Sequence, residues 1–342
     1  MNIIVLTGGT SSERNVALAS GKAISEALKG SGHNVRVVDP IYGKEQPPED
    51  VVFGGRLQIG QEFPTAEELK AYSNKKVMEC INSPVFDNTD IVFLGLHGKF
   101  GEDGRIQSLL EMRGVNYTGS GVTSSAMAMD KDISKIIFRY YGVATPEWFM
   151  INRNDFDLKQ TDDRIKELIG YPAVIKPNDE GSTVGLSIVQ PDVEDVQLRD
   201  AFDIAFKYSD KIMAEQFIPG RELTVAILGN ETLPVVEIKP KDGFYDYEHK
   251  YTKGMTEYFC PADLPEKLAD EMREKALIAH NALGCKAVSR VDYRLNPQNE
   301  FYCLEVNTLP GMTALSLVPK AAGATGLSFP ALLNRIIELS LS

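Results

Sequence analysis

The chain has 342 residues, of which 43% are hydrophobic and 25% are charged, a composition typical of a globular protein with two or three domains of about 100–150 residues each. Its formal net charge of −12 argues against a nucleic-acid-binding protein, because neutralising phosphates requires an excess of Lys and Arg. No apolar run approaches the roughly 20 residues that cross a bilayer, so we expect no membrane association.

Cysteine spacing and the first residues indicate a compartment. The four cysteines are scattered and form no CxxC pair, which is typical of reduced cytosolic thiols rather than of a disulfide framework or a zinc site. Met1 leads directly into an apolar run without basic residues, so the sequence predicts no signal peptide and a cytoplasmic location.

Residues 1–130 alternate short apolar runs with helical patterns, as in a doubly wound α/β domain built on a parallel sheet. Strands are expected at 3–6, 35–38 and 91–96, and helices at 16–28 and 105–112. The stretch 43–76 contains Pro-Pro and Gly-Gly pairs and is interpreted as an excursion with a small hairpin and a helix.

The remainder predicts two α+β domains, at 131–214 and 215–342. In the first, helices are expected at 131–141 and 162–169, and strands at 148–151, 173–176 and 185–189. Around and after the boundary, strands are expected at 212–217, 223–228 and 234–238, followed by helices at 266–283 and from 329 to the end. Gly142 is a plausible end for the helix that precedes it.

A hairpin near the end of the chain carries the clearest chemical signal. Arg290-Val291-Asp292 and Glu305-Val306-Asn307 lie on two apolar–polar runs, separated by an Asn-Pro-Gln-Asn turn. Because strand side chains alternate between faces, Arg290 and Asp292 share one face, as do Glu305 and Asn307. Two carboxylates and an amide oxygen are ligands that Mg²⁺ prefers, and a magnesium site indicates phosphate chemistry.

The loop 176–185 joins two apolar strands and is rich in small residues, whose backbone N–H groups can close around phosphate oxygens. It is no Walker A loop, because the sequence contains no Gly-x4-Gly-Lys-Ser/Thr. A flexible hairpin loop is the alternative interpretation. Lys176 at its start favours phosphate binding.

Two further loops follow predicted strands, where α/β folds bind ligands. In the loop 97–104, we expect a site role for His97, and for Glu102 and Asp103 a role as the cap and first turn of the next helix. Glu13, in the loop 8–14, either complements the dipole of the helix that follows or anchors a substrate ammonium group.

Two segments in the second half of the chain allow two interpretations each. The aromatic and charged run 245–251 is either a solvated loop or a lid that excludes water from a reactive intermediate. The run 215–222 is either strand and loop residues alone or a clamp for adenine and ribose at a domain hinge.

Five motifs then occur together in one order. They are Gly-Gly-Thr-Ser-x-Glu-Arg, His-Gly-x-x-Gly-Glu-Asp-Gly, Lys-Pro-x-x-Glu-Gly-Ser, Tyr-Asp-Tyr-Glu-x-Lys-Tyr and Glu-x-Asn-Thr-x-Pro-Gly-Met. With this set the chain resembles the D-alanine–D-alanine ligases of the ATP-grasp superfamily, from Gly8 to about Pro319. The resemblance implies a three-domain ATP-grasp fold in which the second and third domains sandwich ATP, with a lid loop at about 243–261.

The resemblance also implies roles for the residues that match. ATP phosphates would meet Lys131 and Lys176, adenine Glu215, Gln216 and Ile218, and the ribose Glu222. Two Mg²⁺ ions, with Mn²⁺ as a substitute, would bind Asp292, Glu305 and Asn307. The first D-alanine would meet Glu13 and His97, and the carboxylate of the second would meet Ser316 and Leu317. Ser182 and Tyr251 would join Glu13 in a hydrogen-bonded set, Lys250 would approach the transferred phosphate, and Arg290 and Gly311 would stabilise the oxyanion.

The implied reaction forms a D-alanyl phosphate from D-alanine and ATP, and the amine of a second D-alanine then attacks it, as in the synthesis of peptidoglycan precursors. The family also implies a homodimer. His249, Ala17 and Thr183 depart from the family pattern. The rival functions are a D-alanine–D-lactate or other dipeptide ligase, which the lid sequence would distinguish, and a non-catalytic nucleotide-binding protein, which the intact set around Arg290 argues against.

Overall fold

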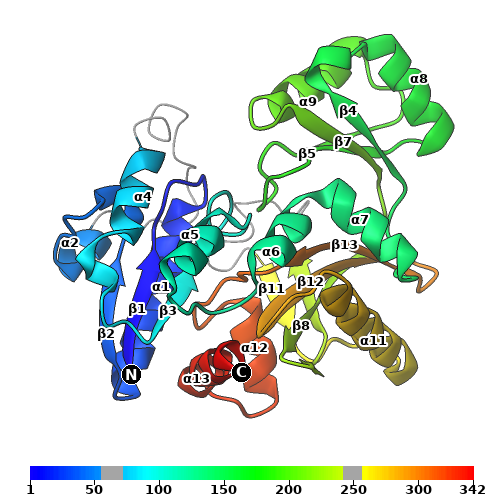
Figure 1. Cartoon of the computed structure of the whole chain (residues 1–342). Helices are drawn as coiled ribbons and strands as arrows, with labels where there is room; N and C mark the ends of the chain where they lie inside the picture. Colours follow the sequence, from blue (N-terminus) through cyan, green and yellow to red (C-terminus); the bar gives the residue numbers. More distant parts are fainter. Residues whose placement is uncertain (55–71, 242–255) are drawn as a thin grey trace.

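The computed structural model describes residues 1–54, 72–241 and 256–342 of the chain. Its strands form three sheets, each associated with its own helices (Figure 1). The molecule is therefore mixed α/β, with a parallel sheet first and antiparallel sheets after it, as the sequence predicts. The division of the chain at 130/131 and 214/215 stays a prediction.

The first sheet is parallel and has the order β2-β1-β3. It comprises β1 (Asn2–Thr7), β2 (Asn34–Val38) and β3 (Ile91–Gly95). Alternate residues of β1 belong to different cores: Ile3 and Val5 pack with α1 (Arg14–Gly30), whereas Ile4 and Leu6 pack with α4 (Asn74–Ile81) and α5 (Arg105–Arg113). Both faces are thus covered, which explains the uninterrupted apolar run and confirms the doubly wound arrangement.

The second sheet has the order β4-β7-β5-β6 and is antiparallel (Figure 1). It comprises β4 (Trp148–Asn152), β5 (Ala173–Pro177), β6 (Ser187–Val189) and β7 (Lys211–Gln216). Its core is shared with α8 (Leu158–Leu168) and α9 (Asp195–Phe206). We did not expect α9, although its buried residues Leu198, Ala201, Phe202 and Ala205 follow helical spacing.

The third sheet has the order β11-β10-β8-β12-β13, with β9 pairing β8. It comprises β8 (Arg221–Leu228), β9 (Glu231–Thr232), β10 (Val236–Pro240), β11 (Thr256–Phe259), β12 (Val288–Leu295) and β13 (Phe301–Asn307). Packed against its strands are α6 (Val122–Met129), α7 (Lys131–Tyr140), α11 (Glu266–Ala282) and α12 (Leu317–Ala324). Val291 and Val306 face the core that contains α11, so their neighbours face the opposite side.

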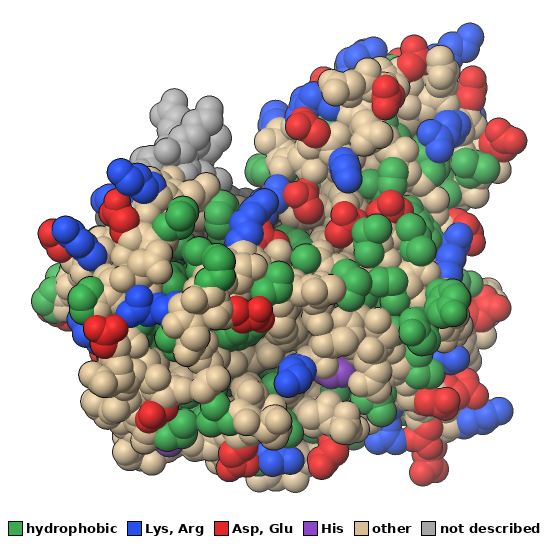
Figure 2. All heavy atoms as spheres, viewed as in Figure 1, with side chains coloured by type: hydrophobic (Ala, Val, Ile, Leu, Met, Phe, Trp, Pro, Cys, Tyr) green, Lys and Arg blue, Asp and Glu red, His purple; other side chains and the backbone are tan. Residues whose placement is uncertain are grey.

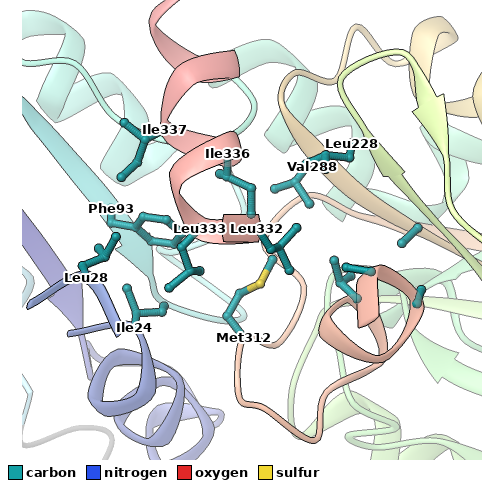
Figure 3. Packing of buried hydrophobic residues seen from close by; sticks show 14 of the residues in the cluster. Ile24, Leu28, Phe93, Leu228, Val288, Met312, Leu332, Leu333, Ile336 and Ile337 are labelled. Carbon is teal, nitrogen blue, oxygen red and sulfur yellow. The ribbon is translucent and has the colours of Figure 1, made fainter. Parts of the chain in front are cut away.

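The last helix, α13 (Phe329–Leu341), joins the first and third sheets. Its residues Leu332, Leu333 and Ile336 lie between two residues of the first sheet and its helix, Ile24 of α1 and Phe93 of β3, and Val288 of β12 (Figure 3). One continuous apolar core therefore fixes the first sheet relative to the third.

Shorter elements complete the chain, namely η1 (Pro40–Tyr42), α2 (Glu49–Phe53), η2 (Pro84–Phe86) and η3 (Arg153–Asp155). Much of the excursion expected at 43–76 lies at 55–71, outside the described residues. All four cysteines are free thiols. Within the described ranges, no helix combines the length and the apolar character that crossing a membrane requires. On the face in Figure 2, basic and acidic side chains are interspersed.

Candidate active site

A cavity of about 420 Å³ lies where loops from the three sheets meet. Its walls include the expected residues Glu13, His97, Ser182, Glu222, Arg290, Asp292, Glu305, Asn307, Gly311, Ser316 and Leu317. Residues separated by up to about 300 positions in sequence thus converge on one space. Lys250 and Tyr251, the expected lid residues, lie outside the described residues.

Glu13 is held at the cavity by the geometry of its loop. The next residue, Arg14, forms a buried ion pair with Asp39 at the end of β2 and donates to the Gly9 carbonyl at 2.8 Å. The Gly9 N–H in turn donates to Asp39 at 3.1 Å, so the loop after β1 is fixed at both ends. The Glu13 carboxylate accepts a hydrogen bond from Ser182, which lies between β5 and β6 in residues 178–185, here named the 178–185 loop. This bond joins the first sheet and its helices (the first unit) to the second sheet and its helices (the second unit).

Two glycines leave room for this carboxylate. A Cβ atom on Gly98 would lie 2.7 Å from Glu13 Oε2, and one on Gly181 would lie 2.9 Å from the same atom. Real Cβ contacts are essentially never that short. The glycines of the second and third motifs therefore create the space that Glu13 occupies.

The hairpin of β12 and β13 brings the expected metal ligands together. Asp292 pairs in register with Glu305, and Arg290 with Asn307. Asp292 accepts from Thr224 at 2.7 Å and from Asn307 at 3.0 Å, and it forms a two-point ion pair with Arg290 at 2.8 and 2.7 Å. The hydrogen bonds fix the carboxylate at the cavity wall. Among the described residues, no three His, Cys, Asp or Glu side chains are grouped as metal ligands. The expected set does not count as such a group, because its third member, Asn307, is an amide.

Lys131 connects the 178–185 loop to this hairpin. Its buried Nζ donates to the Glu180 carbonyl at 2.6 Å and lies 3.1 Å from Glu305 Oε2. Burial alone lowers the pKa of a lysine, but Glu305, Glu180 and Glu215 together outweigh that effect and raise the pKa of Lys131. A permanent positive charge therefore lies beside both the loop and Glu305.

Lys176 belongs to a buried charge cluster centred on Glu215. One carboxylate oxygen of Glu215 lies 2.6 Å from Lys176 Nζ, and the other lies 2.7 Å from Lys135 Nζ. Lys135 also donates to Thr145 Oγ1 at 2.6 Å and to the Pro146 carbonyl at 3.0 Å. Burial lowers the pKa of Lys135 to about 8. The two lysines lower the pKa of Glu215 against the effect of its own burial, so the carboxylate stays ionised.

The expected nucleotide clamp is organised by Arg294, which the sequence did not single out. Its guanidinium donates to the Ile218 carbonyl at 3.1 Å and lies 3.5 Å from Glu222. Gln216 is paired through its backbone N–H with the Glu147 carbonyl at 2.8 Å. Arg294 thus contacts both Ile218 and Glu222.

His97 lies in the cavity wall with both ring nitrogens engaged. Nδ1 is 2.9 Å from the Leu309 carbonyl, which only accepts, so Nδ1 carries the hydrogen. Nε2 then accepts from the Ser20 hydroxyl at 3.0 Å. Burial, with a smaller contribution from the charge of nearby Arg290, lowers the pKa of His97 to about 4, so the ring is neutral at physiological pH.

The capping role expected for Glu102 is wrong. α5 begins after Gly104 and has no side-chain cap. Glu102 instead accepts from the Gly98 N–H at 2.8 Å and from the Leu309 N–H at 3.1 Å. Burial, with a contribution from the nearby Glu13 charge, raises the pKa of Glu102 to about 8. His97 and Glu102 together bind both backbone groups of Leu309.

The first-turn position expected for Asp103 is wrong as well, because α5 begins at Arg105 and its first turn contains no acidic residue. Asp103 precedes the helix and accepts from the Arg105 N–H at 3.2 Å and from the Phe100 N–H at 2.8 Å.

The segment after Leu309 also lines the cavity, with Pro310, Gly311, Thr313 and Ser316 in its wall. The Met312 N–H donates to Ser20 Oγ at 3.4 Å, and the Thr313 N–H donates to Ser316 Oγ at 3.1 Å. Ser316 immediately precedes α12, whose first residue is Leu317. Ser316 and Leu317 both line the cavity, so the N-terminus of α12 lies at its wall, and a helix N-terminus favours a bound carboxylate.

Two family models match the sequence, one in its N-terminal part and one in its C-terminal part. One, described as the D-ala D-ala ligase N-terminus, matches residues 2–120, and another, described as the D-ala D-ala ligase C-terminus, matches residues 137–338. The chain belongs to the D-alanine–D-alanine ligase family. A D-alanine–D-alanine ligase from Syntrophotalea carbinolica is 41% identical over 98% of this chain and 94% of its own length.

Solved structures of ligases share the fold. The D-alanine–D-alanine ligase of Bacillus anthracis complexed with ATP has a TM-score of 0.75 and 31% identity, over 100% of this chain and 97% of its own. The VanG D-Ala:D-Ser ligase of Enterococcus faecalis has a TM-score of 0.77 and 29% identity, over 99% of each chain. Ligases with different second substrates are therefore similar to this chain, so the fold alone does not distinguish among them.

Proposed function

We propose that the chain joins two D-alanine molecules into D-alanyl-D-alanine with conversion of ATP to ADP and phosphate. The observation that supports this most directly is the convergence of Glu13, Arg290 and Asp292 on one cavity beside the 178–185 loop. An ammonium-binding carboxylate, an oxyanion-binding cation and a set of oxygen ligands are the groups that the reaction needs.

In the first step, the carboxylate of one D-alanine attacks the γ-phosphate of ATP and forms an acyl phosphate. Glu13 binds the ammonium group of this D-alanine and so directs its carboxylate toward the phosphate. Lys131 and Lys176 bear the positive charge that the phosphates require, and Lys250 approaches the transferred group. Positioning and charge neutralisation account for catalysis of such transfers.

We propose that the ATP base and sugar bind where β7 leads into β8. Glu215 and Gln216 at the end of β7, together with Ile218, meet the adenine, and Glu222 on β8 meets the ribose. Because two lysines hold the buried Glu215 carboxylate in place, it is preorganised before the nucleotide binds.

Magnesium fits the cavity wall by the chemistry of its donors. Asp292, Glu305 and Asn307 offer hard oxygen atoms on adjacent, in-register strands. When bound there, Mg²⁺ neutralises charge on the phosphates, and we propose two such ions, with Mn²⁺ able to replace them. Before metal binds, Arg290 and Lys131 balance the charges of Asp292 and Glu305.

In the second step, the amine of another D-alanine attacks the acyl carbon and phosphate leaves. Arg290 and the Gly311 N–H stabilise the tetrahedral oxyanion, and losing one such donor typically costs about 10²–10³ in rate. Ser316 and Leu317, at the N-terminus of α12, bind the carboxylate of the incoming D-alanine. Tyr251, with Ser182 and Glu13, orders the lid that protects the acyl phosphate from water.

The test is phosphate release at neutral pH across D-alanine, L-alanine, D-serine and D-lactate, with product masses determined. We expect release that depends on D-alanine and a product with the mass of D-alanyl-D-alanine. Comparable or better turnover with D-lactate or D-serine as acceptor would contradict the choice of second substrate. No release with any acceptor would favour a non-catalytic nucleotide-binding protein.

We also propose that the enzyme is a cytoplasmic homodimer, as the family resemblance implies. Sedimentation equilibrium checks the assembly, and a single species of monomer mass at micromolar concentration would contradict it.

A further inference from the structure

Lys99 reaches from the first unit of the protein into the second. It lies in the loop that follows β3, and its Nζ is 2.7 Å from Glu180 Oε1 and 3.3 Å from Asp179 Oδ2. The same Nζ donates to the Tyr208 carbonyl at 2.9 Å, just beyond α9. One ammonium group thus binds both the 178–185 loop and the segment that follows α9. In the space-filling view, basic and acidic side chains lie next to each other where these two units meet (Figure 2).

This contact is more enclosed than an ordinary surface ion pair. The Glu180 side chain is 8% exposed and that of Lys99 is 28% exposed. Glu180 and Asp179 raise the pKa of Lys99 despite its partial burial, so the ammonium stays charged. A charge pair that is shielded from solvent and geometrically fixed contributes more than an exposed one.

Lys131 links the Lys99 partner Glu180 to the hairpin of β12 and β13, where the metal is proposed to bind. The backbone carbonyl of Glu180 accepts from Lys131, which is 3.1 Å from Glu305. Glu180 is therefore bound through its side chain by Lys99 and through its backbone by Lys131. Displacing this residue moves the part of the loop that lies beside the proposed phosphate site.

A second tie holds the same loop two residues later, where Ser182 donates to Glu13. That tie involves the carboxylate proposed to bind the substrate ammonium group, so it changes when D-alanine binds. The Lys99 contact involves no group that is proposed to touch a substrate. It can therefore hold the loop whether or not D-alanine is present.

We propose that Lys99 is a positioning residue that holds the 178–185 loop against the first unit in the conformation that binds ATP phosphates. The inference rests on the proposed function, because that function assigns the loop to ATP. Without Lys99, part of the binding energy of ATP is spent on ordering the loop, so apparent ATP affinity falls while the chemical step is retained.

The experiment compares Lys99→Met with Lys207→Met. Lys207 is exposed and adjacent to Tyr208, so its substitution removes the same charge from the same region without removing the contact to Glu180. We expect KM for ATP to rise about 5- to 10-fold in Lys99→Met, with kcat within about twofold, as for the loss of a close charge pair. Lys207→Met should keep the wild-type KM.

Direct binding and a double substitution separate positioning from general damage. The Kd of a non-hydrolysable ATP analogue should rise with KM in Lys99→Met and recover in Lys99→Arg. In a Glu180→Gln background, Lys99→Met should lose more than half of its effect, because its main partner is already neutral.

Three results would overturn the inference: an unchanged KM for ATP in Lys99→Met, an equal change in Lys207→Met, or parallel losses of kcat and thermal stability with no selective effect on ATP. The proposed function fails separately if the wild-type protein releases no phosphate with D-alanine. An active wild-type enzyme with an indifferent Lys99→Met variant would refute only the role of Lys99.

Discussion

Glycine 98 offers a test of how closely the protein is packed around Glu13. Gly98 has φ +68° and a Cβ there would lie 2.7 Å from Glu13 Oε2. Gly142 has the same φ, +68°, but a Cβ there would meet nothing within 4 Å. Alanine at either position therefore introduces the same left-handed backbone cost of about 1 kcal/mol. Only Gly98→Ala also displaces the Glu13 carboxylate.

The size of the displacement follows from the geometry. An ordinary contact begins at 3.4 Å, so the carboxylate oxygen must retreat by about 0.7 Å, the difference between 3.4 and 2.7 Å. A charged hydrogen bond such as that proposed between Glu13 and the substrate ammonium contributes about 1.5–3 kcal/mol. Losing it raises KM for the first D-alanine by about 10- to 100-fold.

The assays are steady-state phosphate release with varied D-alanine and urea unfolding of both variants. We expect both variants to lose about 1 kcal/mol of unfolding free energy, and only Gly98→Ala to lose affinity for the first D-alanine. If Gly98→Ala keeps the wild-type KM, or if Gly142→Ala raises it equally, the argument from packing around Glu13 is refuted. Gly181→Ala should also raise KM for the first D-alanine, because a Cβ there would lie 2.9 Å from Glu13 Oε2. It should carry no backbone cost, because Gly181 does not have a left-handed φ.

Three further changes probe other parts of the molecule. Asp292→Asn should abolish magnesium-dependent turnover, and near-wild-type rates in Mg²⁺ would contradict the metal assignment. Lys135→Met should lower the urea-derived unfolding free energy by about 3–5 kcal/mol, because Glu215 stays buried with one partner fewer; a loss below 1 kcal/mol would refute this. His280 has its pKa lowered to about 4 by burial, so the unfolded chain takes up its proton first and stability falls as pH drops from about 6.5 to 4. His280→Gln should reduce that slope by about 1.4 kcal/mol per pH unit, and an unchanged slope would show that this histidine is not responsible.

Local pattern was sufficient to predict the hairpin of β12 and β13. Alternation by two placed Asp292 and Glu305 on faces that the structure brings into register, and the Asn-Pro-Gln-Asn turn fixed where the strands reverse. The same reasoning placed the buried strands of the parallel sheet within a few residues. Strand alternation and turn residues are local patterns, so they can be read from a short stretch of sequence.

Contacts between distant segments could not be predicted in this way. Glu102 looked like a helix cap because acidic residues near a helix start usually are, yet its partner is the backbone N–H of Leu309. A backbone N–H is present at almost every position, so no residue type marks the one that Glu102 binds. Lys99 lay within a motif that we singled out, but its partners depend on how the second unit packs against the first.

Two of the helices that we did not expect, α6 and α12, have a local explanation. α12 contains Pro319 and Gly323, and α6 has small residues with little periodicity, so propensity and pattern both argued against a helix. Packing against the third sheet stabilises these segments as helices despite their sequences.

The position of α13 has a consequence for how the protein is made. Ile24, Leu28 and Phe93 belong to the first sheet and its helix, yet the residues that complete their core are at 329–341. The ribosome synthesises the N-terminal unit first, so this apolar face stays uncovered until residues 329–341 have been made, near the end of translation. This surface of the nascent chain is therefore open to aggregation until the last helix covers it, and slow synthesis of the middle of the chain prolongs that exposure.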